Sequence, residues 1–215
     1  MINDVNQIPI DKSITIISSP RTGSTALCYR INPIIPCFFE IFNPIDNKEE
    51  FRQNFWSNYD ADYLWSCKIF PQMVAKYQIN NKPVIILGLL DQKLDPLLFD
   101  KLSNKSRVFV LKRKDIVGQI TSHYIMNETN KTYYSADESI ADYTVDINED
   151  RIDYIVKLIL NCNIQANKFV DYSEDVIYYE DIKDSLNNHR IQPTINPKNY
   201  NDVRQQVEKQ LKRYV

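Results

Sequence analysis

The stretch ITIISSPRTGSTALCYRI, residues 14–31, joins an apolar run to an apolar-periodic run through the polar turn SSPRTGST. Residues 13–18, SITIIS, are β-branched and apolar, which is typical of a buried parallel strand. Residues 24–31 predict a helix that ends before Pro33. The chain has only 3 glycines in 215 residues, and Gly23 stands in this turn. We therefore predict a strand, a tight turn and a helix N-terminus in immediate succession.

Such a turn is suited to binding an anion. The first N–H groups of the helix lack intrahelical partners, and the helix dipole adds partial positive charge. Gly23 has no Cβ, so the backbone that runs from Thr22 can come close to the anion. Ser24 and Thr25 are predicted to cap the helix and to donate hydrogen bonds. Arg21 supplies a permanent charge on a planar fork. The pattern favours a phosphate or sulfate site, although a plain strand-to-helix turn with a serine cap remains an alternative.

The rest of the chain predicts alternating strands and helices. Further strands are expected at 63–70, 83–90, 107–111 and 174–179, with a short extended piece at 36–42. Helices are expected at 46–58, after Pro71, at 115–130, 149–171, 180–186 and 201–215. This alternation predicts a single domain over residues 1–215 with an α/β, three-layer, P-loop-like fold, in which helices flank a central, mostly parallel sheet. Active sites in such sheets lie at the carboxyl ends of the strands.

Composition restricts the classes of function. The formal net charge is −2, so no general basic surface suggests nucleic acid or an anionic membrane, and an anionic ligand must be held by local charge. The N-terminus does not resemble a signal peptide, and the apolar runs are too short to cross a bilayer. The four cysteines lack C-x-x-C spacing and the two histidines form no metal-ligand pattern. We expect a cytoplasmic protein that is not an integral membrane protein and binds no metal.

Two further motifs stand later in the chain, each at the end of a predicted strand. In LKRKDIVGQITS, residues 111–122, Arg113 and Lys114 stand at a predicted strand end, and Ser122 follows on the predicted helix. A solvated basic strand end is the alternative. In YYEDI, residues 178–182, Tyr179 stands at the end of the last predicted strand, although Glu-Asp is also a common way to begin a helix.

Together the three motifs resemble those of the sulfotransferase superfamily, and the first is closest to the trehalose- and carbohydrate-directed bacterial branch. The resemblance implies that residues 21–25 hold the 5′-phosphosulfate of 3′-phosphoadenosine 5′-phosphosulfate (PAPS). It implies that Ser122 and a cation at the strand end hold the 3′-phosphate, and that Tyr179 contacts the nucleotide. The family has arginine where this chain has Lys114, which cannot form a bidentate fork, so Arg113 is an equal candidate.

The resemblance also implies a catalytic set. Glu40, in PCFFEIF, lies where the trehalose-type branch has its general base, and packing against phenylalanines would raise its pKa toward neutrality. Arg21 would stabilise the leaving phosphate, and Lys68, in WSCKIF, would contact the bridging oxygen or the sulfate. An outward-facing glutamate and a snorkelling lysine are the alternatives. His123 is expected to pack rather than act as a base, because it lies ~100° around the helix from Ser122.

The expected function is therefore transfer of a sulfuryl group from PAPS to a hydroxyl, with a carbohydrate or glycolipid as acceptor. The expected partners are PAPS, its product adenosine 3′,5′-bisphosphate (PAP) and the acceptor, without nucleic acid; homodimerisation is left open. One alternative is a P-loop-like nucleotide-binding kinase, but the chain lacks the G-x-x-x-x-G-K-[ST] pattern that such enzymes need. The second alternative is a non-catalytic nucleotide-binding protein of the same fold.

Overall fold

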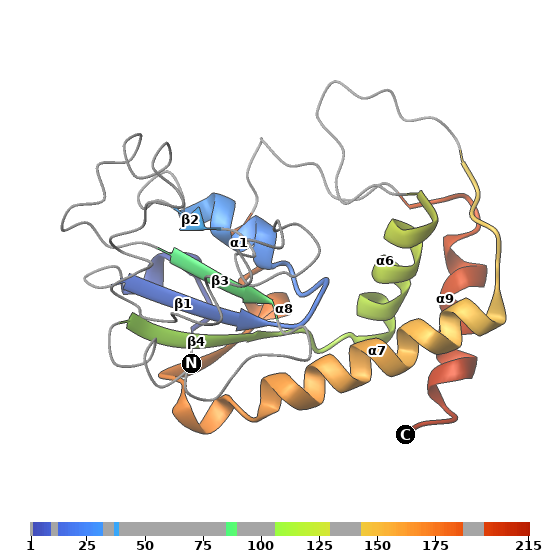
Figure 1. Cartoon of the computed structure of the whole chain (residues 1–215). Coiled ribbons are helices and arrows are strands. Elements are labelled where there is room, and N and C mark those ends of the chain that lie inside the picture. The colour runs from blue at the N-terminus through green and yellow to red at the C-terminus, as the bar shows by residue number, and fades with distance from the viewer. Residues whose placement is uncertain are drawn as a thin grey trace, which may run out of the picture.

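The structure, a computed structural model, contains a five-stranded parallel sheet in the order β2-β3-β1-β4-β5 (Figure 1). The residues that it describes are 2–9, 13–31, 37–38, 85–89, 106–129, 143–186 and 196–215. The strands are β1 (Ser13–Ser18), β2 (Cys37–Phe38), β3 (Ile85–Leu89), β4 (Ser106–Lys112) and β5 (Asp175–Tyr178). The described helices of two turns or more are α1 (Ser24–Ile31), α6 (Ile116–Thr129), α7 (Glu149–Asn167) and α9 (Tyr200–Leu211).

Strand β1 lies at the centre of the sheet. Ile14 is in register with Ile85 of β3 on one side and with Arg107 of β4 on the other. Because all the paired strands are parallel, their carboxyl ends meet at one edge, which points toward α6 in Figure 1. The turn after Ser18 therefore leaves the central strand at the edge where α/β sheets bind ligands.

Both faces of β1 and β4 are buried, which explains their nearly continuous apolar sequences. Ile14, Ile16, Phe109 and Leu111 pack on one face with Leu27 of α1. On the other face, Ile17, Val108 and Val110 pack with Ala166 near the end of α7. The alternation follows the two-residue period of a strand. Figure 1 shows α1 above the sheet and α7 beneath it, so the expected three-layer α/β fold is confirmed.

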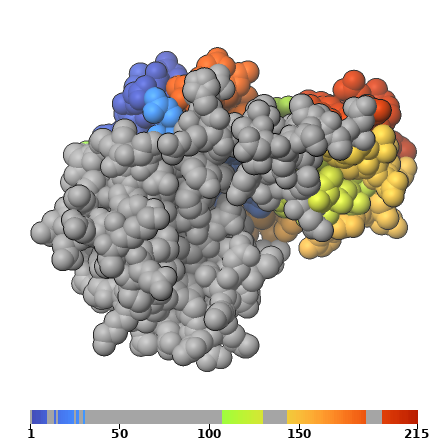
Figure 2. Space-filling view, turned by 90° about the horizontal axis from the view of Figure 1, so that it is seen from above, coloured from blue at the N-terminus to red at the C-terminus, as the bar shows by residue number. Residues whose placement is uncertain are grey.

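A second core lies where α7 extends beyond the sheet and packs with α6 and α9. Its buried residues include Ile120, Tyr124, Ile155, Ile159, Val203 and Val207. Figure 2 shows these helices grouped at one end of the molecule, while the N-terminal residues lie beside the segment that follows α7. Two hydrogen bonds hold the N-terminal residues there: the Ile2 amide donates to Asp175 Oδ2 at 3.0 Å, and the Val5 amide donates to Ser185 Oγ at 3.1 Å. The second core fixes α6 at the carboxyl edge of the sheet.

Several predicted elements are confirmed almost to the residue. The strand at 13–18 and the helix at 24–31 have the predicted bounds, and the strand at 107–111 is β4, Ser106–Lys112. The predicted strand 83–90 is β3, and the predicted helix 115–130 is α6. The short extended piece contributes β2, while the rest of 36–42 and the predicted elements at 46–58, 63–70 and after Pro71 lie outside the described residues.

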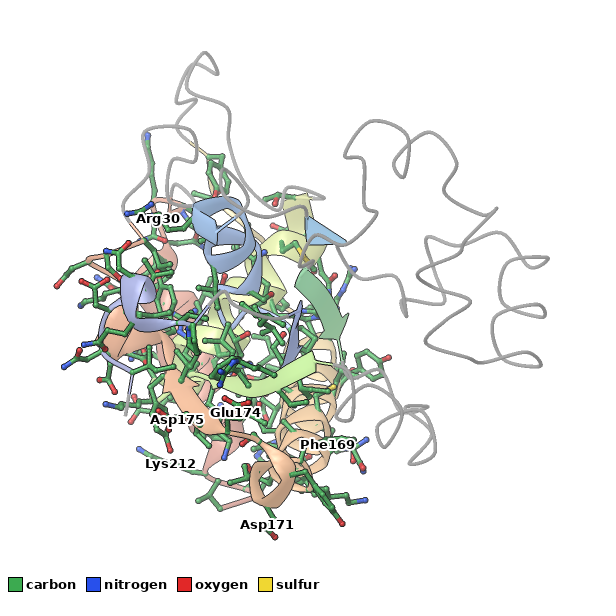
Figure 3. All side chains as sticks on the ribbon, turned by 90° about the vertical axis from the view of Figure 1, so that its left-hand side faces the viewer. Arg30, Phe169, Asp171, Glu174, Asp175 and Lys212 are labelled. Carbon is green, nitrogen blue, oxygen red and sulfur yellow. The ribbon has the colours of Figure 1, made fainter. Side chains whose placement is uncertain are left out.

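Two predicted helix ends are wrong. The helix predicted to reach residue 171 ends at Asn167, because the amides of Lys168 and Phe169 turn back to carbonyls three residues earlier. A 3₁₀ turn, Val170–Tyr172, follows; Figure 3 shows Phe169 and Asp171 at this turn. The last helix, predicted over 201–215, ends at Leu211.

The YYEDI segment also differs from its prediction. Strand β5 ends at Tyr178, and Tyr179 is the first residue of a single helical turn, α8 (Tyr179–Ile182), rather than a strand end. The helix predicted over 180–186 stops after Ile182, where the Ser185 hydroxyl donates to the Ile182 carbonyl at 2.7 Å. Serine hydroxyls that bond to nearby carbonyls in this way compete with helix continuation.

Candidate functional site

The three motifs meet at the carboxyl edge of the sheet. Arg21 Nε donates a hydrogen bond to Ser122 Oγ at 3.0 Å. Arg113 Nη1 donates to the Arg21 carbonyl at 3.2 Å, and the ring of Tyr179 lies against Gly23. These contacts follow from the strand order, since β1, β4 and β5 are neighbours and each motif follows one of them. Residues about 100 positions apart are thereby brought within hydrogen-bond distance.

The turn after β1 has an unusual backbone. Arg21 has φ 61° and Gly23 has φ 84°, and a positive φ is uncommon for any residue other than glycine. The Gly23 carbonyl accepts from the Leu27 amide at 3.0 Å, so Gly23 occupies the N-cap position of α1. The prediction that Ser24 and Thr25 cap the helix is therefore wrong, because both lie inside it. The backbone, rather than a serine cap, shapes the start of α1.

The turn is also held from within. Thr22 is fully buried, and its hydroxyl donates to the Ser19 carbonyl at 3.0 Å. Ser24 is buried at the first helical position. Thr25 lies in α1, but its side chain is outside the described residues. The buried hydroxyl of Thr22 therefore serves the turn itself, and the start of α1 carries the N–H groups that lack intrahelical partners.

The Arg21 side chain lies along α6. Besides bonding Ser122, it places Nη1 4.0 Å from the sulfur of Met126, one helical turn further on. His123 is also near: burial, and then the charge of Arg21, lower its pKa to about 4. His123 is 8% exposed, and its Nδ1 has no hydrogen-bond partner in the described part of the chain. It is therefore a neutral, buried side chain at pH 7.

Arg113 holds the turn and the last strand end together. In addition to its bond to the Arg21 carbonyl, its Nε lies 3.8 Å from Glu180 Oε1. Its Cζ lies 5.3 Å from the centroid of the Tyr179 ring, within the range of a cation–π contact. The Tyr179 ring is therefore in contact with both Gly23 and the Arg113 guanidinium.

Lys114 points to a different partner. Its ammonium pairs with the Asp181 carboxylate and lies 5.0 Å from the centroid of the Tyr178 ring. The amides of Lys114 and Asp115 donate to the two carboxylate oxygens of Glu180 at 2.9 and 3.1 Å. Glu180 thus fixes the start of α6 from α8.

A buried polar network anchors the base of the turn. Gln119 Nε2 donates to Ser19 Oγ at 2.8 Å and to the Pro20 carbonyl at 2.6 Å. The Ser19 hydroxyl donates to Asn163 Oδ1, and Asn163 Nδ2 donates to Gln119 Oε1 at 3.2 Å. The three side chains form a closed ring between the turn, α6 and α7. Sequence reasoning missed Asn163, but a signal existed: it stands four residues after Ile159, where the apolar stripe of α7 predicts an apolar residue.

A bidentate ion pair ties the C-terminal helix to the start of α6. Arg204 Nη1 and Nη2 donate to the two carboxylate oxygens of Asp115 at 3.1 and 3.0 Å. Asp115 Oδ1 also accepts from the Gly118 amide at 2.9 Å. Burial alone would raise the pKa of Asp115, but the hydrogen bonds from Arg204 and Gly118 and the charges of Arg204 and Arg113 leave the pKa below its usual value. Sequence reasoning found no role for Arg204.

The two remaining predicted catalytic residues, Glu40 and Lys68, lie outside the described residues. Within the described ranges, no group of three or more histidine, cysteine, aspartate and glutamate side chains is placed to bind a metal ion. No helix in this part of the chain is long and apolar enough to span a membrane.

The fold and the turn place the chain among three-layer parallel α/β proteins with a turn and helix N-terminus after the central strand. No protein-family model and no curated protein sequence matches the chain. One solved structure with some similarity is that of C. elegans PCH-2, at 12% identity and a TM-score of 0.25. That alignment covers 99% of this chain, which spans 64% of the PCH-2 chain.

Proposed function

We propose that this chain is a sulfotransferase that moves a sulfuryl group from PAPS to a hydroxyl acceptor. The observation that supports the proposal most is the contact between Arg21 and Ser122, at 3.0 Å. These residues belong to two separate motifs of the resemblance, and a single nucleotide with anionic groups on both the 5′ and the 3′ positions of its ribose would need them close together. Arg113 and Tyr179, from the second and third motifs, pack against the same turn.

The proposed reaction is an in-line displacement at sulfur. A bond forms between sulfur and the acceptor oxygen, and the bond from sulfur to the bridging phosphate oxygen breaks, which releases PAP. By analogy with phosphoryl transfer, the transition state is loose and places charge on the leaving oxygen. Arg21 and the backbone N–H groups at the start of α1 would stabilise that charge. The acceptor proton would pass to Glu40, and Lys68 would contact the bridging oxygen.

The local charge suits such a nucleotide. Arg21 and Arg113 meet at the turn, although the chain as a whole has a formal net charge of −2. The sulfuryl group carries less charge than a terminal phosphoryl group, so protein cations can serve where a kinase requires Mg²⁺. We propose a carbohydrate or glycolipid hydroxyl as the acceptor, since segments 43–62 and 127–148 are rich in tyrosine, tryptophan and asparagine. We also propose a cytoplasmic location, on the basis of the cysteine spacing.

A melting experiment separates this function from the kinase alternative. Purified protein is heated with PAP, with ATP and Mg²⁺, or with neither, and each sample is repeated in EDTA. A ligand that binds only the folded state raises the melting temperature. We expect PAP to raise it equally with and without EDTA, and by more than ATP with Mg²⁺. A larger shift with ATP that EDTA abolishes would favour the kinase instead.

A further inference from the structure

The sulfotransferase resemblance leaves one assignment open: which cation accompanies Ser122 on α6. The sequence offers Arg113 and Lys114 at the end of β4. In the structure, however, the side chain that reaches the Ser122 hydroxyl comes from the turn after β1, where Arg21 Nε donates to Ser122 Oγ at 3.0 Å. Arg21 is therefore a third candidate for this cation, and it is in contact with Ser122.

The two sequence candidates are directed elsewhere. The Lys114 side chain is 52% exposed, and its ammonium is paired with Asp181 beyond the end of β5. Arg113 bonds the Arg21 carbonyl, stacks on Tyr179 and lies 3.8 Å from Glu180. These contacts lead to α8 and to the backbone of the turn after β1, and none of them reaches Ser122 on α6.

The backbone at Arg21 supports the same assignment. Its φ of 61° is a conformation that costs a non-glycine residue roughly 1–3 kcal/mol, and strained residues of this kind cluster at active sites and ligand clamps. Arg113 stabilises this conformation by donating to the Arg21 carbonyl. The side chain runs along one face of α6, from Ser122 to Met126. His123 beside it is neutral at pH 7, since its pKa is about 4, so it adds no positive charge to that of Arg21.

We propose that Arg21 and Ser122 together bind the 3′-phosphate of the nucleotide, and that Arg113 is a positioning residue that holds the Arg21 backbone. This inference rests on the proposed function, because it specifies the site of the same nucleotide. One guanidinium then lies between the 5′- and 3′-phosphates, both of which are carried by the ribose. The planar guanidinium presents five N–H donors in a fixed fork, which suits contacts to both groups better than the compact ammonium of a lysine.

The test compares two nucleotides that differ only in the 3′-phosphate: PAP and adenosine 5′-monophosphate (AMP). Calorimetry gives the dissociation constant of each for the wild type and for Ser122→Ala, Arg21→Lys and Lys114→Ala. Lys183→Ala, which removes an exposed lysine at the end of α8, is the matched control. The melting temperature of each variant without ligand verifies that it is folded.

We expect the wild type to bind PAP more tightly than AMP. Ser122→Ala should weaken PAP binding by about tenfold to a hundredfold, the usual range for a hydrogen bond to a charged group, and change AMP binding by less than about twofold. Arg21→Lys should also reduce the preference for PAP, while Lys114→Ala and Lys183→Ala should retain it.

The possible failures are distinguishable. If the wild type binds neither nucleotide, the proposed function is wrong and the inference goes with it. If the wild type prefers PAP but only Lys114→Ala removes that preference, the sulfotransferase proposal stands and the role of Arg21 is wrong. If Ser122→Ala weakens PAP and AMP equally, Ser122 only positions the turn, and the inference is again overturned.

Discussion

The Tyr179 ring occupies the space that a side chain at position 23 would need. A Cβ built on Gly23 would lie 2.3 Å from Tyr179 Cδ2 and 2.6 Å from Cε2, distances at which atoms overlap. Glycine is therefore required here by both the ring and the φ of 84°. The contact joins the turn after β1 to α8, so the first and third motifs depend on each other structurally.

Gly23→Ala should destabilise the protein by at least ~2 kcal/mol, because the strain of a positive φ is added to the steric overlap. Thermal unfolding measures the loss. In a Tyr179→Ala background the overlap is absent and only the backbone strain remains, so the same glycine substitution should cost less. Equal losses in both backgrounds would show that the ring does not lie against Gly23.

The ion pair between Asp115 and Arg204 predicts a pH-dependent stability. The pKa of Asp115 is lowered in the folded protein, so this carboxylate stabilises the fold above its unfolded pKa of about 3.9, and the contribution is lost as pH falls through the lower folded pKa. Asp115→Asn keeps an oxygen to accept from the Gly118 amide but removes the charge. Because the Asp115 side chain is 40% exposed, solvent screening limits the effect at pH 7 to about 1 kcal/mol or less.

Melting curves of wild type and Asp115→Asn should therefore differ by about 2 °C at pH 7 and converge below about pH 3. Asp184→Asn, which changes an exposed carboxylate near the end of α8, is the control and should match wild type throughout. A gap that persists unchanged into strong acid would contradict the ion pair.

His123 should make stability fall at mildly acidic pH. Its pKa of about 4 lies below the ordinary value of about 6.5, so the unfolded chain binds the proton more tightly than the folded protein. The free energy of unfolding then decreases as pH falls from about 6.5 to about 4, by on the order of 2–3 kcal/mol. His123→Leu removes the titrating ring and should flatten the curve in this range.

Proton NMR tests this directly, because the chain has only two histidines and the variant identifies the signal of His123. The signal should titrate near pH 4 in the wild type. Titration near pH 6.5 would show that the ring is hydrated rather than buried beside Arg21.

The network of Ser19, Gln119 and Asn163 should be needed for both stability and ligand binding. Asn163→Ala leaves the Ser19 O–H without an acceptor and the Gln119 carbonyl oxygen without the donor that it has in the wild type, and each buried, unsatisfied group costs about 1–3 kcal/mol. Asn167→Ala, on the exposed side of the same helix, is the control. We expect a lower melting temperature and weaker PAP binding for Asn163→Ala alone; equal behaviour of the two variants would show that the ring does not support the turn.

Local patterns predicted the fold well. The strand at 13–18 and the helix at 24–31 are correct because β-branched residues, a glycine turn and a following proline are each cues within a few residues. The end of α7 and the short α8 were missed because neither helix is followed directly by a glycine or a proline. Hydrogen bonds to carbonyls three residues earlier are found at both ends, from the amides of Lys168 and Phe169 and from the Ser185 hydroxyl.

For the candidate site, the sequence predicted which segments lie together, but it did not predict which side chains form hydrogen bonds with one another. Parallel strands place their ends at one edge, so the meeting of Arg21, Ser122 and Tyr179 follows from topology. Ser122 pairs with Arg21 and not with Arg113 or Lys114. Arg21 has a positive φ, and the presence of an arginine in the sequence does not predict that conformation. Arg204 was missed because its partner lies 89 positions away on another helix.

Calorimetric titration with PAP tests the central claim most directly. Wild-type protein is titrated with PAP in EDTA, in parallel with Arg21→Ala, and the melting temperature of the variant without ligand shows whether it is folded. The account predicts saturable binding of one PAP per chain without a metal, weakened at least about tenfold in a folded Arg21→Ala variant. Absence of heat and of any thermal shift with wild type at millimolar PAP would contradict it.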